Sequence, residues 1–361
     1  MGSAAARSLA KRGLDTVLLE RFAFGHTRGS SHGPTRIFRI AYPDPMYSRM
    51  ARRALDLWRE LEADAGEPLL VQTGGIDAGP VAHLVGQALE MVGERFEWLS
   101  PAEAGERFPS IDFDGLHPIL LQPDAAVALA DRTVAAQLRT AIQAGAHVRD
   151  EAQVVAVEPI DDRVVVRTAS GDDVEARVAV VTAGSWAGPI LARLAPAPMA
   201  LTPILQTVSY FAPRVPEGPR IPTFIEWGSP ELVWYALDPA GEAPGVKIGA
   251  HVGGIPVDPE SGPFPVDEEL VRTQSDYVAR RLPGVDPAAV HADTCLYTMT
   301  PDEDFVLDRV GPVVIGAGFS GHGFKFGPLI GELLAALALG EDPGMGLDRF
   351  LLKRPALAAS R

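Results

Sequence analysis

The most informative stretch of the sequence reads VVIGAGFSGHGFKF, residues 313–326. Its apolar run, its glycine-rich turn and the apolar segment 327–339 predict a strand, a tight turn and a helix. Four glycines within eight residues indicate a backbone that turns sharply or lies against a bulky group. Such a turn directs backbone N–H groups and a positive helix end toward an electron-rich ligand atom. His322 and Lys325 are therefore candidates for chemistry, although a surface turn with a solvated lysine has the same composition.

The composition bounds the kind of protein. A length of 361 residues suffices for about two domains, and 47% hydrophobic with 22% charged residues is typical of a soluble globular enzyme. The net charge of −15 argues against a nucleic-acid or anionic-membrane partner. Cys295 is the single cysteine, which excludes an intrachain disulfide. The sequence also shows no signal-peptide pattern, and together these two observations favour a cytoplasmic protein. No apolar run reaches the roughly 18–20 residues of a membrane helix.

The first twenty residues have the pattern of half a nucleotide-binding unit. MGSAAARSLAKRG predicts a helix, and TVLL predicts a strand that ends at Glu20. In a dinucleotide-binding βαβ unit such an acid holds a ribose hydroxyl, and Gly2 would be the third glycine of G-x-G-x-x-G. The first strand and first two glycines of that unit do not occur, which a late start assignment or a truncation would explain. A surface helix and strand ending in a solvated glutamate is the alternative.

Periodicity outlines the rest of the chain. Residues 25–40 predict a basic anion-binding loop, in which Arg36 and Arg39 would converge if the segment turned helically, or else a solvated loop. The segment 178–182 resembles a buried central strand at the end of a β-meander that starts at 146. The tail, residues 354–360, reads as disordered. Helices are predicted at 46–65, 80–94, 101–107, 131–144 and 266–282, and further strands at 71–79 and 116–122.

From residue 196 to about 301 the pattern changes to strands rich in aromatic and β-branched residues, which predict a mostly antiparallel sheet. The chain is then expected to return, with Cys295 and the strand 312–317, to the first domain's sheet. The fold class is therefore α/β, with a Rossmann-like domain interleaved with an α+β domain that carries the antiparallel sheet. The expected ranges are 1–75, 125–195 and 290–350 for the Rossmann-like domain, and 76–124 and 196–289 for the α+β domain.

Four segments resemble one family in their order and separation. They are GHTRGSSHGPTRIFRIAY (25–42), GVKIGAH (245–251), TCLYTMTPDEDFVLD (294–308) and GAGFSGHGFKFGPLIGELL (316–334). Together they closely resemble monomeric sarcosine oxidase and N-methyltryptophan oxidase, flavoproteins of the D-amino-acid-oxidase-like fold. The resemblance runs from Gly2 to about Pro355, and it implies FAD as the cofactor and no metal.

The resemblance also implies roles for individual residues. Cys295 would carry FAD covalently, and Lys247 would promote oxygen reduction, since a buried cation stabilises developing superoxide. Arg39 and Lys325 would clamp the substrate carboxylate, with Tyr235 and Tyr297 beside the substrate. Three further residues are implied beside the flavin or the substrate, namely His32, Arg36 and His251. The other implied cofactor contacts are Gly2, Glu20, Val154, Gly184, Gly318, Gly321, His322, Gly323 and Phe324.

The implied reaction is oxidation of a secondary (N-methyl) α-amino acid such as sarcosine, giving an imine, formaldehyde, the amino acid and hydrogen peroxide. Its implied partners are the amino acid and O2, and the protein would be a cytoplasmic monomer. Pro34 and Trp234 depart from the family pattern and are expected to border the substrate cavity. They favour a second reading, a flavin oxidase of a cyclic imino acid or a glycated amino acid. A third reading is an N-terminally truncated, FAD-free inactive or binding protein.

Overall fold

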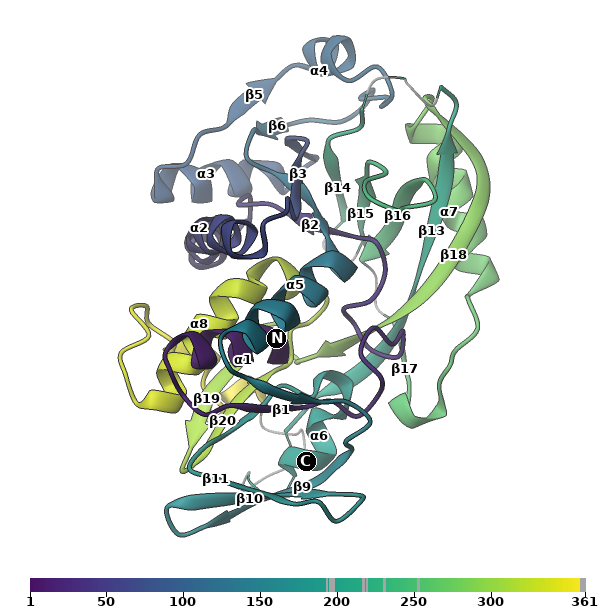
Figure 1. The fold of residues 1–361 in the computed structure, drawn as a ribbon. Helices are drawn as coiled ribbons and strands as arrows, with labels where there is room; N and C mark the ends of the chain where they lie inside the picture. The colour runs from purple at the N-terminus through teal and green to yellow at the C-terminus, as the bar shows by residue number, and fades with distance from the viewer. Residues whose placement is uncertain are drawn as a thin grey trace.

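The computed structural model describes residues 1–192, 194, 199–215, 218, 220–229, 232–251 and 254–357, and the fold is α/β (Figure 1). Its helices are α1 (Gly2–Lys11), α2 (Pro45–Ala65), α3 (Ala82–Val92), α4 (Pro101–Arg107), α5 (Ala130–Gln143), α6 (Ala187–Leu191), α7 (Glu268–Arg281) and α8 (Gly327–Leu339). The strands of the first half are β1 (Val17–Leu19), β2 (Thr35–Phe38), β3 (Leu70–Gln72), β4 (Gly75–Ala78), β5 (Glu97–Leu99), β6 (Ile119–Gln122), β7 (Ala126–Leu129), β8 (His147–Arg149), β9 (Val154–Ile160), β10 (Arg163–Thr168), β11 (Val174–Ala176) and β12 (Ala179–Val181). Those of the second half are β13 (Thr202–Pro213), β14 (Thr223–Ser229), β15 (Leu232–Leu237), β16 (Val246–His251), β17 (Ile255–Pro256), β18 (Val285–Met299), β19 (Val306–Val310) and β20 (Val313–Ala317).

The Rossmann-like region has parallel strands and a layer of three helices. Strand β1 pairs in parallel with β8, and β12 pairs in parallel with β20, which also pairs antiparallel with β19. Helix α1 packs against both α5 and α8. A Cβ added at Gly331 of α8 would lie 2.6 Å from the backbone of Ala4, so α1 and α8 pack closely where glycine lacks a side chain. The predicted strand, turn and helix at 313–339 are confirmed.

Strands β1 and β12 each have a pairing partner on one side only, within the part of the chain that the structure describes. Gly2, at the start of α1, lies near both strands, because an added Cβ would be 2.9 Å from Thr182 Oγ1 and 3.6 Å from Leu18 Cδ1. The expectation that 178–182 forms a buried central strand is therefore wrong. β12 is an edge strand, and Ala179 and Val180 are only half-buried because no strand covers that edge.

The second sheet has nine strands in the order β17-β13-β16-β15-β14-β4-β6-β5, with β18 along β13 (Figure 1). All its pairs are antiparallel except β14 with β4, so the prediction of a mostly antiparallel sheet is confirmed. Helix α7 packs on this sheet, where the ring of Trp234 stacks on Tyr277 at 4.2 Å. Cys295 pairs with Gln206 of β13, so the expected return of Cys295 to the first domain's sheet is wrong. The long strand β18 stays on β13 until Met299, and only β19 and β20 leave this sheet.

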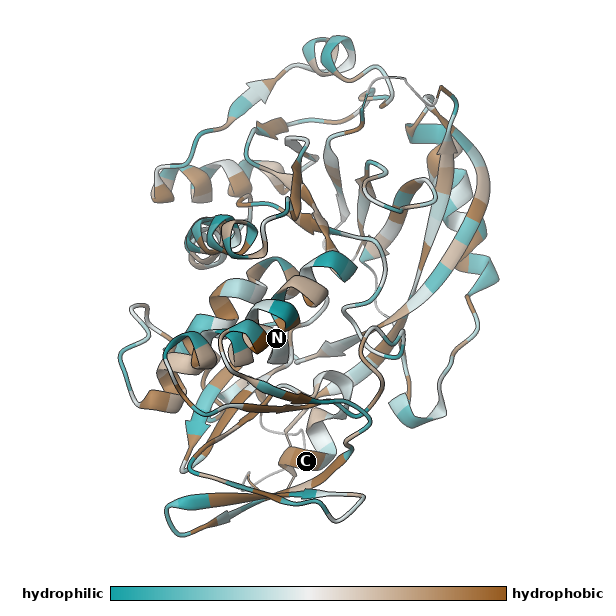
Figure 2. Ribbon diagram, in the orientation of Figure 1, coloured by the Kyte–Doolittle hydropathy of each residue, from teal (hydrophilic) through white to brown (hydrophobic). Residues whose placement is uncertain are grey.

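The predicted β-meander is only partly correct. Strands β9, β10 and β11 form an antiparallel three-stranded sheet, whereas β8 pairs with β1 and β12 pairs with β20. Another sheet, β2-β7-β3, has all four residues of β7 buried, and Figure 2 shows hydrophobic colours on the strands through the middle of the molecule. The domain ranges stay a prediction, and β18 crosses the expected boundary at 290. No helix among the described residues is long and apolar enough to cross a membrane.

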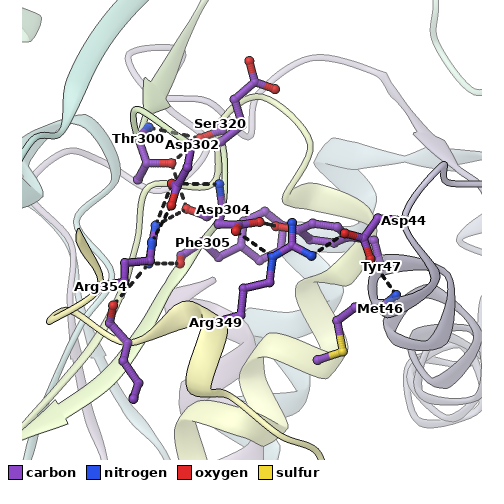
Figure 3. A network of polar contacts seen from close by, with 12 residues as sticks. Asp44, Met46, Tyr47, Thr300, Asp302, Asp304, Phe305, Ser320, Arg349 and Arg354 are labelled. Atoms are coloured by element: carbon purple, nitrogen blue, oxygen red, sulfur yellow. Dashed lines mark hydrogen bonds and ion pairs between the residues drawn. The ribbon is translucent and has the colours of Figure 1, made fainter. Parts of the chain in front are cut away.

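Two arginines fix the C-terminal segment (Figure 3). Arg354 Nε lies 2.7 Å from Asp302 Oδ2, and its guanidinium also donates to the backbone oxygen of Asp304 at 2.7 Å. Arg349 Nε lies 2.6 Å from Asp304 Oδ2. Paired arginines hold this segment on the body of the protein, so the expectation of disorder is wrong as far as Leu357, which is buried. Residues 358–360 of that expectation lie outside the described residues.

Candidate active site

A cavity of about 2390 Å³ extends from the edges of β1 and β12 to strands β15 and β16. Pockets for single drug-sized ligands measure about 300–1,000 Å³, so this cavity has room for a large cofactor and a substrate together. Every residue to which the sequence assigns a catalytic, cofactor or substrate role lines it. These residues are Gly2, Glu20, His32, Arg36, Arg39, Val154, Gly184, Tyr235, Lys247, His251, Cys295, Tyr297, Gly318, Gly321, His322, Gly323, Phe324 and Lys325.

One end of the cavity has the features expected for a nucleotide. Glu20 follows β1 and accepts a hydrogen bond from the backbone N–H of Phe22 at 3.0 Å. Gly2 opens α1 at the cavity wall, so the positive end of the helix lies at the cavity. Val154 and Gly184 also line the cavity, and an added Cβ at Gly184 would meet no atom within 4 Å, so its backbone is open to a ligand.

The glycine-rich turn forms the middle of the cavity wall. Gly321 has φ +77°, which only glycine adopts without strain, and a side chain there would collide with the ring of Tyr297. Half-buried His322 lies with Nδ1 3.3 Å from the Tyr42 hydroxyl and Nε2 3.2 Å from the Glu303 carbonyl. Burial, followed by the charge of Lys325, holds the pKa of His322 well below its usual value of 6.5. His322 is therefore a neutral, positioned ring.

Lys247 projects from β16 into the cavity and is only 5% exposed. Its Nζ donates to the backbone oxygen of Thr35 at 3.2 Å and lies 5.7 Å from the centre of the Tyr210 ring. Burial, followed by the charge of Arg36, lowers the pKa of Lys247 to about 7, although Asp293 and Asp131 act in the opposite direction. The ammonium is therefore available near neutral pH in a site of low polarity.

Cys295 and Tyr297 stand two residues apart on β18, so their side chains share the face that lines the cavity. Cys295 is a half-buried free thiol. Tyr235 of β15 donates a hydrogen bond to the Tyr297 hydroxyl, and its ring lies across Gly249 of the neighbouring strand. Burial raises the pKa of both tyrosines above 10, so both stay protonated. The structure thus brings the predicted flavin thiol beside the two predicted substrate residues.

The two predicted carboxylate-binding cations meet at one place. Lys325 Nζ donates to the Tyr42 hydroxyl at 2.7 Å and to the backbone oxygen of His322 at 3.0 Å. The guanidinium carbon of Arg39 and the Nζ of Lys325 lie 4.8 Å and 5.1 Å from the centre of the Tyr42 ring. Burial, followed by repulsion from Arg39, holds the pKa of Lys325 well below its usual value of 10.5. Arg39 Nη1 donates to Asp77 Oδ1 at 2.7 Å.

Arg36 lies on strand β2 and Arg39 follows it directly, so their segment is extended rather than a helical turn and the two guanidinium groups have different partners. Arg36 donates to the backbone oxygens of Thr35, Ser30 and His32 at 2.8, 2.9 and 2.7 Å. It therefore braces the loop that precedes β2. His32 Nε2 lies 3.0 Å from the Thr294 oxygen, and burial, followed by the charge of Arg36, lowers the pKa of His32.

The substrate-side wall contains residues that the sequence reading missed. Trp234 and Pro34, expected at the cavity, do not line it; Trp234 points to α7 because side chains alternate along β15. Trp227 lines the cavity instead, as does Glu303, whose carboxylate lies 3.9 Å from His251 Nε2. The sequence also missed Tyr42, which lines the cavity, and Asp77, which contacts Arg39 without lining it. Tyr42 and Glu303 belong to quoted motifs, whereas a lone aspartate or tryptophan in a strand gives no local pattern.

Comparison with known proteins gives a consistent result. The sequence model of the family described as FAD dependent oxidoreductase (DAO) matches residues 1–337. The peroxisomal sarcosine oxidase of Homo sapiens is 34% identical, with 98% of this chain and 93% of the relative covered. The monomeric sarcosine oxidase of Arthrobacter sp. is 32% identical, with 99% and 94% covered. The N-methyl-L-tryptophan oxidase of Yersinia pestis is 28% identical, with 98% and 96% covered.

Two solved structures have the same fold. The open form of NikD, described as an unusual amino acid oxidase essential for nikkomycin biosynthesis, has a TM-score of 0.84 at 26% identity, covering 97% of this chain and 94% of NikD. The L-proline dehydrogenase from P. horikoshii also has a TM-score of 0.84, at 22% identity, with 98% and 94% covered. The likeness to this dehydrogenase shows the fold alone.

The lowered pKa of Lys247 predicts a specific dependence of stability on pH. Between about pH 7 and pH 10.5 the unfolded chain binds a proton at Lys247 that the folded protein lacks, so this residue makes wild-type stability rise with pH. Lys247→Met removes the titration. We subtract the free energy of unfolding of wild type from that of the variant, both measured by urea unfolding. This difference should be larger at pH 6 than at pH 9 by about 2–3 kcal/mol.

Exposed Lys353→Met is the matched control, and its difference from wild type should not vary with pH. The same pH dependence in wild type and Lys247→Met would contradict the burial of a neutralised amine at position 247.

Proposed function

The chain belongs to the DAO family of FAD-dependent oxidoreductases, and we propose that it oxidises a secondary (N-methyl) α-amino acid such as sarcosine. FAD-dependent amine oxidase activity follows from the family and from the sarcosine oxidase relatives. This favours an enzyme over the FAD-free alternative. The particular amino acid and the products belong to the proposal.

The residues present fit FAD. Gly2 and Glu20 would hold the nucleotide end, and Gly184, Gly318 and Gly321 leave backbone without side chains along the cavity. When bound, FAD supplies a two-electron acceptor for a C–H bond next to an amine nitrogen and returns the electrons to O2, giving hydrogen peroxide. The remaining predicted contacts are Val154, His322, Gly323, Phe324 and Cys295.

One observation carries the proposed substrate class, namely the convergence of Arg39 and Lys325 on one ring, Tyr42, at the cavity wall. Two buried donors of this kind match the two oxygens of a carboxylate. Aromatic Tyr235 and Tyr297 line the neighbouring space and favour the neutral amine over the ammonium ion, because an apolar wall disfavours charge. Oxidation of the N-methyl carbon gives an imine, which water hydrolyses to formaldehyde and the primary amino acid.

Other expectations rest on the same family. The cytoplasmic location and the monomeric state remain predictions, supported for the monomer by relatives named monomeric sarcosine oxidase. The human relative is named as peroxisomal. A ring substrate such as pipecolate is the second candidate, and its support comes from Trp227, whose flat ring lines the cavity, and no longer from Trp234.

A substrate panel tests the proposal. Sarcosine, N-methyl-L-tryptophan, L-pipecolate, L-proline and fructosyl-glycine are each offered in air, and peroxide and formaldehyde are measured. We expect the highest kcat/KM with an N-methyl amino acid and formaldehyde equal to peroxide. Dimethylamine, which lacks the carboxylate, should react far more slowly. A preference for pipecolate or proline would move the assignment to cyclic imino acids, and no peroxide with any amine would contradict an amine oxidase.

Lys247 is proposed to assist oxygen reduction, since its buried amine can place positive charge beside developing superoxide. In Lys247→Met, flavin reoxidation by O2 should slow by about 100-fold or more, whereas anaerobic reduction by the substrate should change by less than about tenfold. Stopped-flow absorbance measures the two half-reactions separately. Lys353→Met is again the control, and equal slowing of both half-reactions would contradict the assigned role.

Cys295 is proposed to attach FAD covalently, since its thiol faces the cavity beside Tyr235 and Tyr297. After acid precipitation of the purified protein, the flavin absorbance should stay with the pellet. In Cys295→Ser it should appear in the supernatant. Because this is the chain's single cysteine, the variant leaves no other thiol to substitute. Release of flavin from wild type would show that no covalent link forms, and the oxidase assignment would stay intact.

A further inference from the structure

The proposed carboxylate site contains a buried anion of its own. Asp77 on β4 is 2% exposed, and its Oδ1 accepts hydrogen bonds from Arg39 Nη1 at 2.7 Å and from Trp227 Nε1 at 2.9 Å. Arg39 and Trp227 line the cavity, whereas Asp77 does not. The aspartate therefore lies behind the guanidinium, where a substrate does not reach it.

Among the residues that the structure describes, Lys325 has no charged hydrogen-bond acceptor. Its Nζ donates to the Tyr42 hydroxyl and to the His322 carbonyl, which are both uncharged. Arg39 is the charge that acts on Lys325 most directly, and it repels a proton from Nζ. Burial and this repulsion favour the neutral amine while the cavity holds no anion. The other titratable groups in the part of the cavity that contains Lys325 are Tyr42, Tyr47, His322, His251 and Glu303.

We propose that Asp77 is the internal counter-ion of the carboxylate site, so that the substrate carboxylate binds together with one proton. Asp77 balances the charge of Arg39 before the substrate arrives, and the proton moves from solvent to Lys325 Nζ as the carboxylate enters. This inference rests on the proposed assignment of Arg39 and Lys325 as the carboxylate site.

Charge balance among Arg39, Asp77 and Lys325 decides whether a proton binds with the carboxylate. Before binding, Arg39 and Asp77 cancel and Lys325 is neutral. A carboxylate then adds one negative charge, and a net charge is costly in a site shielded from water. Protonation of Lys325 restores balance. Without Asp77 the charge of Arg39 alone would balance the ligand, and no proton would be needed.

The geometry also makes Asp77 a positioning residue. A single oxygen, Oδ1, accepts from both Arg39 and Trp227, so one carboxylate orients the guanidinium and the indole ring that line the cavity. Asn in its place keeps an acceptor oxygen of the same shape and removes only the charge. Asp77→Asn therefore separates the counter-ion role from the positioning role.

The test measures acetate binding to the flavin-loaded enzyme by calorimetry from pH 6.5 to 9.5, in buffers of different ionisation enthalpy. Acetate lacks an amine and does not titrate in this range. Wild type should take up close to one proton per acetate, and above the pKa of Lys325 its affinity should fall about tenfold per pH unit. Asp77→Asn should take up fewer protons and have a flatter profile. It should bind acetate more tightly than wild type, most clearly at the alkaline end, because a negative charge beside the anion has been removed.

Tighter binding by Asp77→Asn at the alkaline end is the decisive feature, because a damaged site would bind acetate more weakly at every pH. Glu226→Gln is the matched control. Glu226 is another buried carboxylate paired with an arginine, Arg281 at 2.9 Å, on the adjacent strand β14, and it does not line the cavity. Its profile should follow wild type. Lys325→Met provides a second variant, and it should abolish proton uptake while Asp77 is intact.

Three results would overturn the inference. The first is acetate binding by wild type without proton uptake. The second is an Asp77→Asn profile parallel to that of wild type, and the third is proton uptake that persists in Lys325→Met. In each of these cases the carboxylate site stands and only the counter-ion role is lost. Failure of wild type to bind acetate at any pH would instead overturn the proposed carboxylate site, and the counter-ion role with it.

Discussion

The structure depends on burying three basic side chains around one cavity, each with a hydrogen-bond acceptor already in place. Lys247, Arg39 and Lys325 are each less than one tenth exposed, and each donates to a different kind of acceptor. These acceptors are a backbone carbonyl of β2, the carboxylate of Asp77 and a tyrosine hydroxyl. A buried cation is stable only where such acceptors are already in place. These acceptors lie on β2, on β4 and in the segment just after β2, so the path of the backbone decides where the basic side chains can lie.

Alternation along strands decides which side chains reach that cavity. On β15, Val233, Tyr235 and Leu237 line the cavity, while Trp234 lies between them in sequence and packs on α7. On β18 the same rule places Cys295 and Tyr297 on one face. One segment thus serves the hydrophobic core of the nine-stranded sheet and the chemistry of the cavity at once, and a shift of one residue in register would exchange the two roles.

The sequence predicted those parts of the fold and site that local patterns encode. Glycine spacing and apolar runs located β20, α8 and the turn between them, and quoted motifs contained every predicted cavity cation. Pairing between distant strands was not predictable in the same way. Nothing in HVR or AVV distinguishes a meander from the parallel pairs with β1 and β20, since the choice depends on tertiary contacts. Asp77 and Trp227 escaped prediction for the same reason, because they meet Arg39 only across the folded sheet.

The short loop that contains Glu303 is held from both sides. From outside, Arg349 and Arg354 bind its neighbours Asp304 and Asp302 (Figure 3). From inside, its own carbonyl contacts His322 at 3.2 Å and its carboxylate faces His251. The rim of the cavity is therefore linked through these ion pairs to the C-terminal segment that contains Arg349 and Arg354. Arg354 does not line the cavity, yet loss of its ion pair with Asp302 would loosen the loop whose Glu303 faces His251.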